Sequence, residues 1–542
     1  MLDVLIIGSG GAGLSAALAA KEISTVEGVG LGNASILVVG KTYPTNSQTS
    51  MAQGGMNAAL GNAGEDHISS HISDTIQSAH GLCDEDMVRQ MCADAPKTIQ
   101  WLESIGVPFS RLDNGKSDVE TVAQRQMGGA SAKRACYAQD YTGLKILHTL
   151  YDTCLKEKID FLDEHYLLNL ITEKTSTDTI IKGATFLDIR TGEIKQINAK
   201  SVVLATGGYG SIYHGYTTNA YGSTGDGIAA VLRAGGAVSD MEFVQFHPTA
   251  LKHSSILISE SARGEGGYLL NSDGERFIDE LKPRDEVARA IFEQLQKDKE
   301  VFLDVRHLGV EKLMELLPQE VALCKLHEHI DPSTELIPIK PVAHYSMGGI
   351  DVDYALEVTG IKGCFAVGEC SNAKVHGANR LGGNSLLEIT AFGKFAGENA
   401  YKQAVYASNK KADDTQLQRD EKEIETLFSK ENDINFYTQR KALGKLFYEK
   451  VGIVRENGQL NAALENVIAM QVALAKTGLS DKSKKNNQNL IEYLEFQNVL
   501  LLAPTIISSA LARDESRGAH FKLGFEAENK EFQKHIVLQW KD

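Results

Sequence analysis

Short apolar runs recur along the chain, and each of them leads directly into glycine. The run "DVLIIG" begins at Asp3 and continues through "SGGAG" into a segment rich in Ala and Leu, and "ASILVVG" covers residues 34–40. A continuous apolar run of this length before a glycine turn is typical of a strand buried in a parallel sheet. Two such runs with a helical segment between them predict a β–α–β unit of the dinucleotide-binding type.

Two later segments repeat this pattern: "SVVLATGGYG" at residues 201–210 and "GCFAVGE" at residues 363–369. Because the last one follows a long interval, we expect one nucleotide-binding domain to be assembled from discontinuous segments. From residue 406 the sequence becomes charged, poor in glycine and compatible with helices. A chain of 542 residues is also too long for one small core, so two or three domains are expected.

These patterns predict an α/β (α+β) fold with three domains. A Rossmann-type domain comprises residues 1–236 and 351–405, a capping domain is inserted at residues 237–350, and a helical C-terminal domain covers residues 406–542.

Composition and charge exclude several classes of function. The net charge of −16 argues against a nucleic-acid-binding protein, which needs basic patches to offset phosphates. The seven dispersed cysteines fit reduced thiols and form no disulfide, metal or iron–sulfur pattern, so electrons that pass through clusters would need another chain. No run of 18 or more apolar residues occurs, so we expect no direct membrane insertion and a cytoplasmic protein, free or peripheral on the inner membrane.

The first glycine cluster has the spacing of a dinucleotide site. Gly8, Gly10 and Gly13 form GxGxxG, which supplies a tight turn, room for a pyrophosphate and close packing of helix on strand. The second strand ends at Gly40 and Lys41 without the acidic residue that binds a ribose hydroxyl of NAD. This departure counts against NAD and favours FAD.

Other glycine junctions support a flavin. "ATGGYG" closes the third strand, Asp226 in "STGDGIAA" is placed to accept a ribose or ribityl hydroxyl, and "AQGG", which ends at Gly55, allows backbone to approach a ring closely. For each junction taken alone, an ordinary turn is the alternative.

The chain is similar to the flavoprotein subunits of the succinate dehydrogenase/fumarate reductase family from residue 2 to about residue 525. The motifs that carry this resemblance, in chain order, are "MAQGG", "RACYAQDYTG", "ATGGYG", "EFVQFHPTAL", "SARGEGGYL", "PRDEVARAI", "HYSMGGI", "GCFAVGE", "HGANRLGGNSLLE" and "DESRGAH". L-Aspartate oxidases share most of them but resemble one another in a glutamate that meets the substrate ammonium. Met127 in "RQMGG" stands at that place, and a thioether cannot pair with an ammonium. Aspartate oxidase therefore stays the less favoured alternative.

The resemblance implies an FAD site. Its residues in this chain are Gly8, Gly10, Gly11, Gly13, Lys41, Gln48, Thr49, Gln53, Gly54, Gly55, Thr206, Gly207, Asp226, Glu369, Arg380, Ser385 and Leu386.

The resemblance also implies reduction of a C=C bond flanked by two carboxylates, in which a flavin gives a hydride to one carbon and an acid protonates the other. It assigns carboxylate binding to His247, His344, Arg380 and Ser259, beside Met127, and proton delivery to Arg284 through a relay of Glu260 and Arg263. The relay pair would share one face if their segment is helical. The alternatives are satisfied buried histidines and a plain salt bridge between Arg284 and Asp285.

Gln48 stands where many respiratory members of the family carry a histidine bonded covalently to the flavin. An amide is no nucleophile toward the flavin, and the nearest following histidine is His67, so we expect noncovalent FAD. In the family, loss of the covalent bond harms succinate oxidation more than fumarate reduction. The sequence therefore favours the fumarate reductase direction without excluding succinate dehydrogenase.

The resemblance implies a small dicarboxylate substrate, fumarate or succinate. It also implies an iron–sulfur partner subunit with a membrane-anchor or heterodisulfide-reductase-like subunit. Besides L-aspartate oxidase, three alternatives are a soluble oxidase, a soluble fumarate reductase without an anchor, and a noncatalytic FAD-binding assembly protein. The sequence leaves open whether the electron donor is a quinol, a thiol or a soluble carrier.

Overall fold

The computed structural model describes residues 1–26, 32, 34–112 and 121–540. Its largest sheet has the order β6-β2-β1-β9-β8-β7, with β16 also paired to β9. Parallel pairing aligns Ile7 with Leu204 and Leu204 with Ala366, so these strands end together at one edge. The strands are β1 (Leu2–Ile7), β2 (Ile36–Val39), β6 (Asp160–Leu162), β7 (His165–Lys174), β8 (Thr179–Asp188), β9 (Ile194–Leu204) and β16 (Cys364–Ala366).

All four strands predicted from the apolar runs are present in this sheet. β16 lies beside β9 although about 160 residues separate them in the chain, so this sheet is built from segments that are distant in the sequence. The antiparallel pair β7 and β8 extends the sheet from the first half of the long strand β9.

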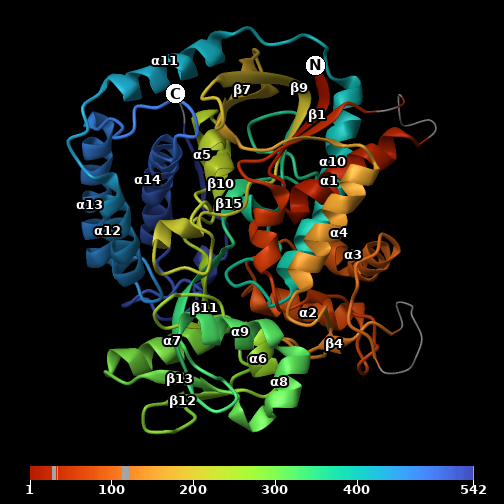
Figure 1. The fold of residues 1–542 in the computed structure, drawn as a ribbon, viewed down its shortest axis with the longest axis vertical. Helices are drawn as coiled ribbons and strands as arrows, with labels where there is room; N and C mark the ends of the chain where they lie inside the picture. The colour runs from red at the N-terminus through yellow and green to blue at the C-terminus, as the bar shows by residue number, and fades with distance from the viewer. Residues whose placement is uncertain (27–31, 33, 113–120, 541–542) are drawn as a thin grey trace.

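Helices α1 (Gly11–Ser24) and α10 (Asn384–Tyr406) pack closely next to this sheet (Figure 1). A Cβ placed at Gly397 of α10 would lie 2.0 Å from the backbone oxygen of Ala16, so glycine is needed for this approach. The other helices of the N-terminal half are α2 (Ile68–Ser78), α3 (Glu85–Ser104), α4 (Thr142–Lys156) and α5 (Asp226–Arg233).

Two smaller sheets complete this part of the molecule. One has the order β17-β15-β10-β18, from β17 (Ser371–Asn372), β15 (Gly349–Asp351), β10 (Ala237–Ser239) and β18 (Val537–Gln539). The other has the order β3-β5-β4, from β3 (Met56–Asn57), β5 (Ala135–Cys136) and β4 (Gln124–Arg125). Short 3₁₀ helices include η1 (Pro44–Asn46), η2 (Gln48–Met51), η4 (Gly210–Tyr213) and η6 (Gly368–Cys370).

A second apolar core lies within residues 251–339, which we call the cap. Its buried side chains run from Leu251 to Ile339 and include Leu269, Leu303 and Val321. The cap forms the green unit at the bottom of Figure 1, inside the predicted insertion at residues 237–350, whose boundaries stay a prediction. Its elements are the end of β11 (Val244–Leu251), α6 (Glu260–Gly264), β12 (Tyr268–Asn271), α7 (Arg284–Gln296), β13 (Val301–Asp304), η5 (Arg306–Leu308), α8 (Val310–Leu316), α9 (Pro318–His327) and the start of β14 (Ile337–Ser346).

The C-terminal region is mainly helical, as predicted. It contains α11 (Thr415–Ser429), α12 (Phe436–Lys450), α13 (Asn457–Lys476) and α14 (Gln488–Ala512), followed by η7 (Lys530–Phe532) and β18. Among the residues the structure describes, α14 alone is long and apolar enough to cross a membrane, but 72% of its most apolar stretch is buried inside the protein. Such burial is typical of the core helix of a globular domain.

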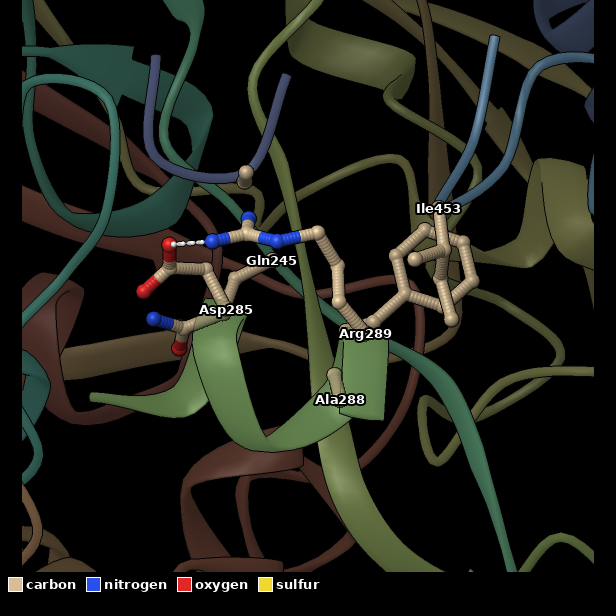
Figure 2. A pocket seen from close by; sticks show the side chains of 7 residues that line it. Gln245, Asp285, Ala288, Arg289 and Ile453 are labelled. Atoms are coloured by element: carbon tan, nitrogen blue, oxygen red, sulfur yellow. Dashed lines mark hydrogen bonds and ion pairs between the residues drawn. The ribbon is translucent and has the colours of Figure 1, made fainter. Parts of the chain in front are cut away.

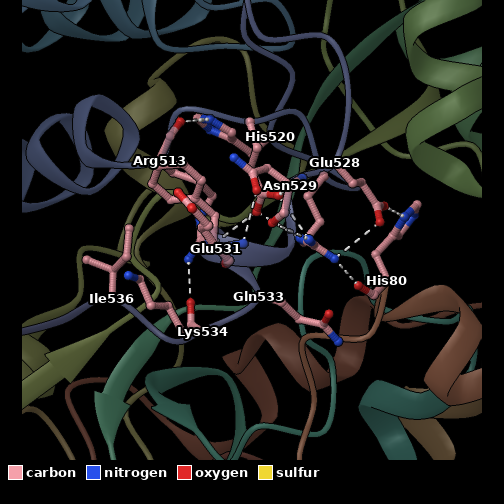
Figure 3. Close-up of polar contacts among 12 residues, drawn as sticks. His80, Arg513, His520, Glu528, Asn529, Glu531, Gln533, Lys534 and Ile536 are labelled. Carbon is pink, nitrogen blue, oxygen red and sulfur yellow. Dashed lines mark hydrogen bonds and ion pairs between the residues drawn. The ribbon is translucent and has the colours of Figure 1, made fainter.

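The segment after α14 carries an ionic cluster, shown in Figure 3. Arg513 is fully buried and donates to Glu242 Oε1 at 2.5 Å, and Arg517 donates to Glu515 at 2.8 Å. Burial raises the pKa of Glu242, although Arg513 opposes that shift. His80 lies at the edge of the cluster, 2.7 Å from Glu528. The cluster joins the "DESRGAH" segment to the residues just before β11, the strand that leads into the cap.

Candidate active site

The first glycine motif forms a cradle at the N-terminus of α1. Gly8 follows β1 with φ of +114°, and a Cβ there would lie 2.1 Å from the backbone oxygen of Ala205. A Cβ at Gly13 would lie 1.9 Å from the oxygen of Gly8. The Gly11 amide donates to Thr49 Oγ1 at 3.1 Å, which ties the helix start to η2. These contacts explain why the turn and the helix packing require glycine.

The residues around this cradle fit a flavin dinucleotide. Ser47 Oγ, Gln53 Oε1 and Thr206 Oγ1 are buried and have no hydrogen-bond partner within the described chain. Unpartnered buried polar atoms are rare in native proteins, so a polar ligand that supplies partners is indicated. Space is also present, because nothing lies within 4 Å of a Cβ placed at Gly207. The helix N-terminus at Gly10 suits a pyrophosphate.

Most of the other predicted FAD residues lie near this cradle or at the start of α10. Gln53, Gly54 and Gly55 precede β3, Glu369 lies on η6, and Ser385 and Leu386 are in the first turn of α10. Burial raises the pKa of Glu369 to about 7, and its carboxylate accepts from the Ser346 amide at 3.0 Å. Their role as cofactor ligands stays a prediction.

Lys41 and Asp226 meet in a charged cluster. Lys41 Nζ lies 2.7 Å from Asp226 Oδ2 and 2.7 Å from Glu495 Oε1. Burial alone would lower the pKa of Lys41, but the two carboxylates raise it above its usual value. The other Asp226 oxygen accepts from Tyr166 and Asn498 at 3.1 and 2.9 Å. Both carboxylate oxygens are thus occupied by protein donors, and the predicted hydroxyl contact of Asp226 stays a prediction.

Glu260 lies at the centre of the proposed proton relay. Arg284 Nε and Nη2 donate to Glu260 Oε2 at 3.0 and 2.7 Å, and Arg263 Nη2 donates to Oε1 at 3.2 Å. Glu260 and Arg263 share one face of α6, as the spacing predicted. Burial by itself would raise the pKa of Glu260, but the two arginines outweigh it and the pKa is lowered. The structure therefore brings the three predicted relay residues together.

Gln245 connects two predicted functional arginines, and sequence reasoning missed it. Its Oε1 accepts from Arg284 Nη1 at 3.0 Å and from Arg380 Nη2 at 3.1 Å, while Nε2 donates to Asn379 Oδ1 at 2.7 Å. Burial and the nearby Arg284 charge lower the pKa of Arg380 to about 10. The available signal was the position two residues before His247 in "EFVQFHPTAL", since alternate strand residues face the same side.

The two predicted carboxylate-binding histidines lie side by side, with ring centroids 4.9 Å apart. His247 lies on β11, where its Nδ1 accepts from the Thr249 amide at 3.2 Å, and His344 lies on β14 with Nδ1 2.8 Å from Thr218 Oγ1. Burial and the charge of Arg284 hold both pKa values well below 6.5. Both rings are therefore neutral at physiological pH, which leaves the positive charge of the site to arginine.

Ser259 and Met127 both lie near Gly54 of the predicted flavin loop. Ser259 is the N-cap of α6, and its Oγ accepts from the Ser261 amide at 3.1 Å. Met127 is buried in the segment that follows β4, and a Cβ at Gly54 would lie 2.6 Å from its Cε. Met127 thus contacts the predicted flavin loop one residue before Gly128, whose amide donates to Glu260.

Gln48 begins η2 and its side-chain oxygen accepts from the Ala220 amide at 2.9 Å. His67 is the exposed residue before α2, so it belongs to another element. Noncovalent attachment of FAD stays a prediction.

Helix α7 begins at Arg284, and its first turns line a small pocket that is shown in Figure 2. Asp285 pairs with Arg289 at 2.9 Å, and Arg289 also donates to the Gly518 oxygen at 2.9 Å. Arg284 pairs with Glu260 instead of Asp285, so the simple salt-bridge alternative is wrong. The residues that line the pocket are Gln245, Phe246, Asp285, Ala288, Arg289, Ile453 and Ala519.

Comparisons with known proteins identify the family of the chain. The family model described as "FAD binding domain" matches residues 3–386, and "Fumarate reductase flavoprotein C-term" matches residues 440–542. The 8-methylmenaquinol:fumarate reductase flavoprotein subunit of Wolinella succinogenes is 38% identical over 100% of this chain and 90% of its own length. The succinate dehydrogenase flavoprotein subunit of Coxiella burnetii is 38% identical over 99% and 94%.

Among solved structures, a variant of Escherichia coli quinol fumarate reductase superposes with a TM-score of 0.91 at 36% identity. The match covers 99% of this chain and 94% of the other. The site and fold define an FAD-binding oxidoreductase. The chain belongs to the fumarate reductase/succinate dehydrogenase flavoprotein family, as the motifs predicted.

Proposed function

We propose that this chain is the catalytic flavoprotein subunit that interconverts fumarate and succinate, with fumarate reduction as its working direction. The observation that carries the proposal is the buried Arg284–Glu260–Arg263 array beside Arg380 and the two neutral histidines. Such a group of cations matches a substrate with two carboxylates.

Each of these residues has a distinct role. Arg380 binds one carboxylate through its planar guanidinium, while His247 and His344 donate neutral hydrogen bonds. FAD, when bound, supplies the hydride to one substrate carbon. Arg284 delivers a proton to the other carbon, which balances the reduction of fumarate to succinate. Glu260 then passes a proton from Arg263 to Arg284, because it contacts both guanidinium groups, and a proton from solvent restores Arg263.

We also propose the partners and the location. The curated relatives are named as flavoprotein subunits, and a structural relative is a quinol fumarate reductase, which supports an iron–sulfur partner subunit. A membrane-anchor or heterodisulfide-reductase-like subunit would complete the complex. The chain would then lie in the cytoplasm, peripheral to the inner membrane.

The function is tested by reducing the purified FAD-loaded protein with dithionite and adding substrate. We expect fumarate to reoxidise the flavin rapidly, malonate to compete, and L-aspartate to be a poor electron donor because Met127 cannot pair with its ammonium. Slow reoxidation by fumarate would favour a noncatalytic FAD-binding protein, and rapid turnover of L-aspartate would favour the oxidase alternative.

Cofactor attachment is tested separately. With Gln48 at the attachment position, acid denaturation should release all of the flavin into the supernatant, measured by its absorbance and fluorescence. Flavin fluorescence that stays with the polypeptide on a denaturing gel would contradict noncovalent binding.

A further inference from the structure

The carboxylate of Asp140, in the FAD-binding part, binds the N-terminal turn of helix α9 in the cap. Asp140 lies just before α4, and its Oδ2 accepts from the amides of Gln319 at 2.7 Å and Glu320 at 3.1 Å. These amides belong to the first turn of α9, where the helix dipole favours a negative charge. Asp140 is completely buried, so the contact is shielded from water. It joins two parts of the molecule that have separate apolar cores.

Glu320 extends this contact toward the active site. Its Oε1 accepts from the backbone amide of Ser259 at 2.8 Å, and Ser259 is the N-cap of α6, directly before Glu260. The second oxygen, Oε2, is buried and lacks a hydrogen-bond partner in the part of the chain that the structure describes. Asp140 Oδ1 is in the same condition. Protonation of a carboxyl group turns one of its oxygens from an acceptor into a donor.

The charges around Glu320 come from both parts. The pKa of Glu320 is raised to about 8, mainly by burial and then by the nearby Asp140 charge, while Arg125 opposes the rise. Burial also raises the pKa of Asp140. The Arg125 guanidinium stacks 3.6 Å from the Tyr137 ring and donates to the Gln139 backbone oxygen. Neither of these contacts is with the carboxyl group of Asp140 or Glu320.

Two further titratable groups, Cys324 and Tyr141, face the two carboxyl groups, and neither supplies a positive charge. Cys324 on the same helix faces Glu320, and its own pKa is raised by burial. Tyr141 faces Asp140, and burial raises its pKa as well. Two carboxyl groups that share a buried site cannot both ionise without a large cost.

We propose that Asp140 and Glu320 form a carboxyl latch that holds the cap closed and positions Ser259 and Glu260, with Asp140 ionised and Glu320 protonated. The latch acts through other groups, so both are positioning residues. This inference rests on the proposed function for one point, that the site under the cap binds a dicarboxylate. The latch contact itself involves no substrate.

The latch has a defined dependence on pH. If Glu320 regains its ordinary pKa of 4.5 when the cap opens, the closed form binds one more proton than the open form between about pH 4.5 and pH 8. Closure therefore weakens as pH rises through this window, by up to about tenfold per pH unit, and becomes independent of this group above about pH 8.

Amide hydrogen exchange of the FAD-loaded full chain measures closure without turnover. Exchange, corrected for chemical rates, is followed in peptides covering residues 257–263 and 317–324 between about pH 6 and pH 8.5. We expect protection in the wild type to fall across this range and to level off near pH 8. Glu320→Gln, a neutral isostere, should remain protected with a flat profile. A wild-type profile that is flat, or a Glu320→Gln profile that keeps the slope, overturns the proposal.

A second variant isolates the helix cap. Asp140→Ala should raise exchange in the same peptides about tenfold, because the first-turn amides of α9 lose their acceptor. The matched control is Asp84→Ala, which removes a carboxylate cap from α3 within one part of the molecule. It should leave the two cap peptides unchanged. If Asp140→Ala fails to bind FAD, Asp140→Asn keeps the acceptor and should raise exchange about two- to threefold. Wild-type exchange in every Asp140 variant would refute the latch, whatever the fumarate assay gives.

Discussion

Arg284→Lys should lower the rate of fumarate-dependent flavin reoxidation by about 1,000-fold or more, which is within the range of a lost general acid. In the structure the guanidinium donates three hydrogen bonds, two to Glu260 and one to Gln245. A lysine ammonium keeps the charge but cannot span both partners in fixed geometry. Substrate affinity should change little, since proton delivery is used only in the transition state.

Single-turnover reoxidation and the dissociation constant of succinate for the oxidised protein are the two measurements. Arg276→Lys is a suitable control, because Arg276 is an exposed arginine on the cap that pairs with Glu280. Its reoxidation rate should equal that of the wild type. Near-normal reoxidation by Arg284→Lys would mean that another group gives the proton, even though the family assignment stands.

Arg380→Lys should weaken both binding and turnover. Arg380 is 4% exposed, has an Nε without a hydrogen-bond partner in the described residues, and lies over the Tyr345 ring at 4.3 Å. A lysine there loses the bidentate contact with a carboxylate, so the dissociation constant should rise by about 30-fold, roughly 2 kcal/mol. Titration of the flavin spectrum with succinate or malonate measures it. An unchanged dissociation constant would remove Arg380 from the substrate site.

The sequence was most informative where local geometry dictates residue type. Gly8 and Gly13 predicted the turn and the helix packing correctly, because a side chain at either position would collide with backbone. The spacing of Glu260 and Arg263 predicted one helix face, and they do form an ion pair on α6. The late strand "GCFAVGE" returned to the first sheet, as its pattern indicated.

Contacts between distant segments were not predictable from pattern. Gln245 carries no charge, so nothing in its own residue type marks it as the amide between Arg284 and Arg380. Asp140 and Glu320 lie 180 residues apart, and each looks like an ordinary surface carboxylate in the sequence. Their significance depends on burial and on the approach of two separately folded parts, which only the three-dimensional structure provides.

The strand order β17-β15-β10-β18 also constrains how the chain is made. β10 begins at Ala237, whereas its neighbour β18 ends at Gln539. During synthesis one edge of β10 therefore stays unpaired until some 300 further residues have left the ribosome. An unpaired strand edge is a template for wrong association. Closing so distant a pair is also slow. Assembly of this small sheet is thus a late event, and one edge of β10 stays open to wrong association until β18 arrives.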